Sequence, residues 1–126
     1  MKKFFILLVL LPLLVACQER DELLFIGNSK NWSVELVVSV INGSEKNQLE
    51  IRYNGNNLNS IESFDYFVEN NRRETTFGAE KVNLDKDGSY RNNALSSNSP
   101  STKLEDTFNI TINWNGYSEN FELKKK

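Results

Sequence analysis

The chain has 126 residues, of which 39% are hydrophobic and 25% are charged, and its formal net charge is −2. This length allows one domain, and the composition is that of a globular chain rather than a disordered one or a protein with several membrane spans. The sequence has no His and a single Cys, which excludes His-based acid–base catalysis, a disulfide framework and a zinc site of several thiolates.

The first residues have the pattern of a secretory signal. Two lysines precede an apolar run over residues 4–15, which is too short to span about 30 Å of hydrocarbon as a helix. The run ends in Leu14-Val15-Ala16-Cys17, which resembles the lipobox of bacterial lipoproteins. The resemblance implies that residues 1–16 are a lipoprotein signal peptide, cleaved between Ala16 and Cys17, and that the Cys17 thiol carries diacylglycerol. The alternative is an ordinary signal peptide followed by a buried core Cys.

The mature chain that this cleavage predicts is mildly acidic, with 13 basic against 17 acidic residues. A domain of this charge without a basic patch attracts neither nucleic acid nor an anionic membrane surface, so no nucleic-acid partner is expected and the membrane is reached through the lipid. Residues 17–31 are interpreted as the lipidated Cys and a short tether, with 23–26 either a short edge strand or free linker. Arg72-Arg73 and the C-terminal lysines are interpreted as solvated turns and ends.

Residues 32–126 are predicted to form one β domain, because apolar and polar side chains alternate in short segments. The alternating segments are residues 32–40, 49–53, 63–69 and a less regular one over 75–84. Gly78 indicates a bulge in the last of these. The polar stretch 88–103 is predicted to be a long loop.

The strongest local pattern is a predicted hairpin near the C-terminus. Two alternating segments flank Asn115-Gly116, and an Asn-Gly pair in this position is typical of a type I′ turn. The predicted register pairs Trp114 with Tyr117, Ile112 with Glu119, Ile110 with Phe121 and Phe108 with Leu123. Three of the four pairs are apolar, so this register explains the pattern of both strands except at Glu119.

No segment has a helical period over ten or more residues. Six or seven short strands, each with one apolar face, predict an all-β fold, namely a single antiparallel β-sandwich that is immunoglobulin-like, has about seven strands and lacks the disulfide. A small β-barrel is the alternative, since turn chemistry does not separate the two architectures.

Two short motifs of this predicted domain carry a family resemblance. Phe25-Ile26-Gly27-Asn28-Ser29-Lys30-Asn31-Trp32 and Ile112-Asn113-Trp114-Asn115-Gly116 resemble segments of small lipobox-containing lipoproteins of low-GC Gram-positive bacteria, Bacillus and relatives. The eighteen Asn residues suit such a host. The resemblance extends along most of residues 23–123 and implies an extracytoplasmic location and a compact β domain. It implies no activity and no functional residues.

One segment resembles part of a metal site. Asn83, Asp85 and Asp87 alternate and are followed by Gly88, as in the first half of a calcium-binding loop. The second half does not match, because Ala94 stands where a bidentate Glu is needed. A calcium site and a plain turn are the two alternatives for this segment, and the plain turn is favoured.

The other candidates favour binding over catalysis. Glu105-Asp106 and the pair Asp65 and Glu69 are interpreted as solvated charges, because nothing in the sequence indicates a substrate groove. The Ser residues lack an activating base, so no enzyme activity is expected.

Phe67, Trp114 and Tyr117 are the candidate binding residues. Trp114, like Trp32, is in phase with aliphatic core positions, so core packing is favoured over a stacking platform for sugars. Phe67 is out of phase with its neighbours in the segment. It is therefore either exposed, as a small interaction patch near Arg72-Arg73, or buried in a sheet that is covered on both faces.

These features predict a membrane-anchored, extracytoplasmic lipoprotein that is a non-enzymatic binding or structural module of the cell envelope, without a cofactor other than its lipid. The partner would be an envelope protein or a glycan, met at sheet edges or at the 88–103 loop, because loops on a rigid scaffold carry most recognition. The alternative is a carrier of a small ligand or of a cation such as calcium, which would bind at the 85–88 turn or at aromatic side chains.

Overall fold

A computed structural model describes residues 20–41, 44–74, 76–97, 102–103 and 105–126. It has eight strands, β1 (Arg20–Asn28), β2 (Trp32–Ile41), β3 (Ser44–Tyr53), β4 (Phe64–Asn70), β5 (Thr76–Val82), β6 (Ser89–Ser97), β7 (Phe108–Trp114) and β8 (Tyr117–Lys125), and a short 3-10 helix, η1 (Leu58–Ser60). The predicted signal peptide, with Ala16 and Cys17, lies outside the described residues. Within the described ranges, no helix has the length and apolar character needed to cross a membrane.

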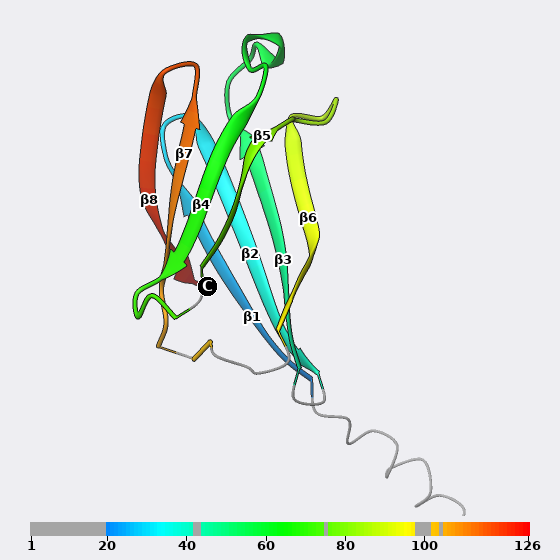
Figure 1. The fold of residues 1–126 in the computed structure, drawn as a ribbon, viewed down its shortest axis with the longest axis vertical. Helices are drawn as coiled ribbons and strands as arrows, with labels where there is room; N and C mark the ends of the chain where they lie inside the picture. The colour runs from blue at the N-terminus through cyan, green and yellow to red at the C-terminus, as the bar shows by residue number, and fades with distance from the viewer. Residues whose placement is uncertain (1–19, 42–43, 75, 98–101, 104) are drawn as a thin grey trace, which may run out of the picture.

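The eight strands form one antiparallel sheet in the order β5-β4-β7-β8-β1-β2-β3-β6. The sheet folds back on itself, so that the half β5-β4-β7-β8 faces the half β1-β2-β3-β6 (Figure 1). The two halves are joined where β1 pairs with β8, through the residue pairs Phe25–Lys125 and Ile26–Lys124. On the other side, the edge strands β5 and β6 are not paired with each other in the described sheet, which is therefore a nearly closed barrel.

The predicted all-β, antiparallel class is confirmed, with eight strands instead of about seven. The architecture combines the two predicted alternatives, because its halves face each other as in a sandwich and are joined along one side as in a barrel. Each half of the sheet has four strands, whereas an immunoglobulin constant-type domain packs a sheet of four strands on a sheet of three. The order of the strands also differs between the two folds. Local alternation of apolar and polar residues carries no information about this order.

The core lies between the two halves and is built from the alternate positions of the strands. Its buried residues include Phe25, Trp32, Val34, Leu36, Leu49, Ile51, Phe64, Val68, Phe108, Ile110, Ile112, Trp114 and Leu123. Aromatic rings meet across it, with the Trp32 ring centroid 5.0 Å from that of Phe64 and 5.4 Å from that of Trp114. The favoured interpretation of both Trp residues as core residues is therefore confirmed.

The side of the barrel that hydrogen bonds do not close is filled by tyrosines. Tyr66 on β4 and Tyr90 on β6 lie with their ring centroids 5.5 Å apart and their hydroxyl oxygens 3.4 Å apart. Burial, and then the hydrogen bond with Tyr90, raise the pKa of Tyr66 to about 12. Packing of side chains between β4 and β6 thus takes the place of a β5–β6 ladder.

The segment 23–26 belongs to an inner strand, not to an edge strand or a linker. β1 lies between β8 and β2 and pairs with β2 over nine residues, from Arg20 to Asn28. Gly27, which marks the end of the apolar run in the sequence, continues the strand. A Cβ at this position would lie 2.4 Å from the carbonyl oxygen of Glu122, so Gly27 allows β8 to approach β1 closely.

Most of the stretch that was predicted to be a loop over residues 88–103 is strand β6, so this prediction was wrong. β6 pairs with β3 from Arg52–Ser89 to Glu45–Ser97. Pairing with one neighbour satisfies half of its backbone groups, and an edge strand with one solvated face tolerates a polar sequence. The pairing shifts between Asn47 and Leu49, which places a bulge in this edge strand.

The other edge strand, β5, also has a bulge, but not at Gly78, which pairs with Phe67 in regular register. The register shifts between Phe64 and Tyr66, and Lys81 opposite this shift has a φ of 53°. The N–H of Lys81 donates a 2.8 Å hydrogen bond to Asp65 Oδ1, which stabilises the irregular backbone. Bulges in both edge strands hinder the pairing of the sheet with another chain.

The β7–β8 hairpin has the predicted register, from Trp114–Tyr117 to Phe108–Leu123. Asn115 and Gly116 have φ values of 49° and 81°, as a type I′ turn requires. The structure also explains the exception at Glu119.

The Glu119 carboxylate lies against the turn between β1 and β2 and accepts three hydrogen bonds from it. Asn31 donates from its backbone N at 3.2 Å and from Nδ2 at 2.5 Å, and the Ser29 hydroxyl donates the third bond. Burial raises the pKa of Glu119, but the hydrogen bonds from Ser29 and Asn31 outweigh burial and lower it below its ordinary value. Glu119 thus ties β8 to the opposite half of the sheet.

We expect Glu119→Gln to lower the free energy of unfolding by about 1–2 kcal/mol, because the amide cannot accept all of these bonds. The measurement is urea denaturation, with Glu122→Gln, an exposed position on the same strand, as the matched control. Because the pKa of Glu119 is lowered in the folded state, its contribution is present above the ordinary carboxyl pKa of about 4.3 and is lost as the pH falls through the lowered value. A difference between wild type and variant that grows on acidification would contradict this assignment.

Candidate functional site

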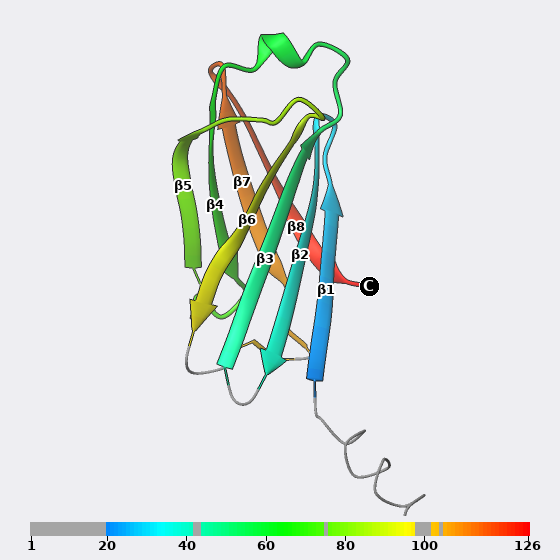
Figure 2. The ribbon, with the colours of Figure 1, turned by 90° about the vertical axis from the view of Figure 1, so that its right-hand side faces the viewer.

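The domain has two ends that differ in what they carry. β1 begins at Arg20 at one end, together with the β4–β5 turn (Figure 2). The other end carries the β1–β2 turn, the segment with η1, the β5–β6 turn and the β7–β8 turn, and we call it the hairpin end. A hydrogen bond of 2.6 Å from Asn115 Nδ2 to the carbonyl oxygen of Ser60 joins the β7–β8 turn to the η1 segment.

A shallow depression of about 440 Å³ lies at the hairpin end, where β4 and β7 meet the β7–β8 turn. Trp114 and Tyr117, two of the predicted binding residues, line it, together with Asp65, Lys81 and Asn113. Tyr117 is 65% exposed, and its ring lies 5.6 Å from that of Trp114 at an interplanar angle of 37°. The buried indole therefore supports a tyrosine ring that is open to solvent.

A second depression, of about 390 Å³, adjoins the first and shares Asp65 and Asn113 with it. Phe67, the third predicted binding residue, lines this depression and is 47% exposed. Of the two alternatives for Phe67, the exposed one is therefore correct. Phe67, Asp65 and Asn113 lie on the outer face of β4 and β7, whereas Tyr117 pairs with the buried Trp114 at the rim of the hairpin end. The two depressions that these residues line adjoin each other, and we call the two depressions together the aromatic surface.

The polar groups of the aromatic surface are only partly used within the protein. Asp65 accepts the N–H of Lys81 with one oxygen, Oδ1. Across the described residues, the side-chain amide of Asn113 has no hydrogen-bond partner, and its position is exposed. A donor and an acceptor are thus available to a ligand where the two depressions meet.

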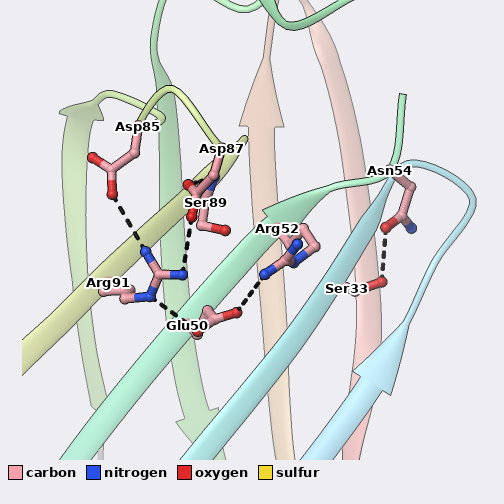
Figure 3. Close-up of polar contacts among 8 residues, drawn as sticks. All are labelled: Ser33, Glu50, Arg52, Asn54, Asp85, Asp87, Ser89 and Arg91. Carbon is pink, nitrogen blue, oxygen red and sulfur yellow. Dashed lines mark hydrogen bonds and ion pairs between the residues drawn. The ribbon is translucent and has the colours of Figure 1, made fainter. Parts of the chain in front are cut away.

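The carboxylates of the candidate calcium segment, Asp85 and Asp87, form ion pairs with an arginine. Asp85 Oδ2 lies 3.5 Å from Arg91 Nη1, and Asp87 Oδ2 lies 3.2 Å from Arg91 Nη2 (Figure 3). Glu50 accepts from Arg91 Nε at 3.1 Å and from Arg52 Nη2 at 3.2 Å. The hydrogen bond from Arg91 lowers the pKa of Asp87 below its ordinary value. The Arg91 guanidinium therefore offsets the charge of these carboxylates.

The backbone of this segment forms a turn, in which the N–H of Gly88 donates to the carbonyl oxygen of Asp85 at 3.0 Å and Gly88 has a φ of 79°. Asn83 is exposed and lies before the turn. In the part of the chain that the structure describes, no three acidic, Cys or His side chains are grouped to hold a metal ion. The calcium site remains a prediction that only a titration tests.

We expect millimolar calcium to leave the melting temperature of the protein unchanged, because a cation would have to displace Arg91 from both carboxylates. Any ligand that binds the native state raises the apparent stability, so thermal denaturation with and without calcium measures this directly. Magnesium at the same concentration is the control for ionic strength. A shift of the melting temperature with calcium alone would restore the calcium site at Asp85 and Asp87.

The interpretation of Asp106 and Arg72 as solvated charges was wrong. Asp106 is 1% exposed, and Arg72 binds it with two parallel hydrogen bonds, Nε to Oδ1 at 2.8 Å and Nη2 to Oδ2 at 2.7 Å. The N–H of Lys103 also donates to Asp106, at 2.8 Å. The pair lies away from the hairpin end, and no local signal could have revealed it, since its members are 34 positions apart in the chain.

Comparison with known proteins does not assign this chain to a family. No known family, characterised protein or solved structure shows a significant match to the chain.

Proposed function

We propose that the protein is a lipid-anchored, extracytoplasmic binding module of the cell envelope, held at the membrane through Cys17. The pattern of the first residues supports this proposal, because two lysines, an apolar run and Leu14-Val15-Ala16-Cys17 follow one another in the order of a lipoprotein signal. The proposal includes no catalytic step, since the sequence has no His and its one thiol is assigned to the lipid.

The observation that supports the binding role is the arrangement of the domain, in which the proposed anchor and the aromatic surface lie toward opposite ends. β1 begins at Arg20, three residues after Cys17, and an extended tether of this length reaches only about 10 Å. The aromatic surface lies toward the opposite, hairpin end of the sheet. An anchor at Cys17 would thus hold one end of the domain close to the membrane and direct the aromatic surface away from it.

Two acyl chains provide stable attachment, so the wild-type protein is expected in the membrane fraction of bacterial cells. Its mass should show the loss of residues 1–16 and the gain of a diacylglycerol group. Cys17→Ser is expected to abolish both the lipid and the cleavage, and Gln18→Ser, which leaves the thiol in place, is the matched control. A wild-type protein with an uncleaved leader and a free Cys17 thiol would overturn the proposal.

A further inference from the structure

Two exposed aromatic rings lie on adjoining depressions in the described part of the domain. Phe67 and Tyr117 are the large hydrophobic side chains that are exposed in the described part of the chain, and both line the aromatic surface. A single exposed apolar residue needs no explanation, whereas two rings on adjoining depressions indicate a binding site. The tilted contact of Tyr117 with the buried Trp114 restricts one of these rings, which reduces the conformational entropy that is lost when a ligand binds.

The surface beside Phe67 is rich in amide and hydroxyl groups. Asn113 lies in both depressions, next to Asp65 on the neighbouring strand. Thr111, which pairs with Phe67, accepts a hydrogen bond of 2.7 Å from Asn120 Nδ2, and the same amide donates to Asn109. The outer face of β7 and β8 is therefore polar and uncharged beside Phe67.

The charges of the aromatic surface disfavour an anionic ligand. Asp65 and Lys81 line the first depression and offset each other, and Glu80 with Asp65 makes the second depression acidic. Both depressions are open to solvent and lie side by side across β4, β5 and β7, which suits an extended ligand better than a small enclosed one.

We propose that the aromatic surface binds an uncharged, extended oligosaccharide. A sugar ring presents an apolar C–H face that packs on an aromatic ring, and hydroxyl groups that need donors and acceptors at its edge. Phe67 on the outer face and Tyr117 at the rim of the hairpin end are the two platforms, and Asn113 and Asp65, where the two depressions meet, provide the hydrogen bonds. This inference rests on the proposed function, which would place the surface among the glycans of the cell envelope.

The test is calorimetric titration of the full-length protein with tetra-N-acetylchitotetraose and with cellotetraose, in a detergent whose headgroup is not a sugar. We expect at least one of them to bind, and Tyr117→Ala and Phe67→Ala each to weaken that binding about tenfold. Tyr117→Phe keeps the ring and is the matched control, with an affinity expected to be within about twofold of wild type. Because both rings are exposed, far-UV circular dichroism is expected to show the same fold in all variants.

The inference is overturned if neither tetrasaccharide binds, or if the Phe67→Ala/Tyr117→Ala double variant binds as tightly as wild type. Binding of tetralysine instead of either sugar would also overturn it and would assign the surface to a cationic peptide. These outcomes are independent of the lipid. A protein that carries diacylglycerol but binds no sugar contradicts this inference alone, whereas one that binds sugar with an unmodified Cys17 contradicts only the anchoring.

Discussion

Replacing Trp32 with Ala is expected to lower the free energy of unfolding by about 3–5 kcal/mol, the largest single effect in this domain. Trp32 is completely buried, and its ring packs against Tyr53 at 5.2 Å as well as against Phe64 and Trp114. Phe64 and Trp114 belong to the other half of the sheet, so the substitution leaves a cavity at the contact between the halves.

Urea denaturation followed by circular dichroism measures this effect, provided that the transition is two-state. Tyr117→Ala is the matched control, because it also removes an aromatic ring but from a side chain that is 65% exposed, and its cost should stay below about 1 kcal/mol. Equal losses for the two variants would contradict the assignment of Trp32 to the core. Since Trp114 packs on both Trp32 and Tyr117, the Trp32 variant should also lower the affinity of the aromatic surface for its ligand.

The second large effect is expected at the ion pair between Arg72 and Asp106. Asp106→Ala removes the acceptor of both guanidinium hydrogen bonds and of the Lys103 N–H, and we expect a loss of about 2–3 kcal/mol in the free energy of unfolding. Glu105→Ala changes the exposed neighbour and is expected to cost less than about 0.5 kcal/mol. Equal effects of the two substitutions would contradict the buried pair.

The pH dependence of stability tests the same pair by another route. The hydrogen bond from Arg72 lowers the pKa of Asp106 below its ordinary value of about 3.9. Its stabilising contribution is therefore complete above the ordinary pKa and is lost as the pH falls through the lowered one. Wild type should lose stability on acidification below about pH 4, and Asp106→Ala should lose less over the same range.

The strands with strong alternation and clear turns could be predicted from the sequence. Asn115-Gly116 specified the hairpin turn, and the apolar positions on either side then determined the register. The same periodicity assigned Trp32 and Trp114 to the core, and it identified Phe67 as out of phase. In each case the decisive information lies within a few residues of the feature.

Features that depend on distant partners could not be predicted. β6 has a polar sequence and exists because β3 provides its hydrogen bonds, and β1 is internal because β8 returns beside it at the end of the chain. The burial of Asp106 depends on Arg72, and the partners of Glu119 are almost ninety positions away. The aromatic surface was predicted only as separate residues, because the sequence does not show that β4 and β7 are neighbours.

The pairing of β1 has a mechanical consequence. With the anchor proposed at Cys17, a pull on a partner bound near the hairpin end is transmitted to the membrane along β1. The ladder to β2 extends over nine residue pairs, and its hydrogen bonds are perpendicular to the strands, so the load acts on all of them at once in shear. The junction with β8 is antiparallel as well but has two residue pairs, and it links β1 to the half of the sheet that carries the aromatic surface. The strand nearest to the anchor is thus the one best placed to resist extension.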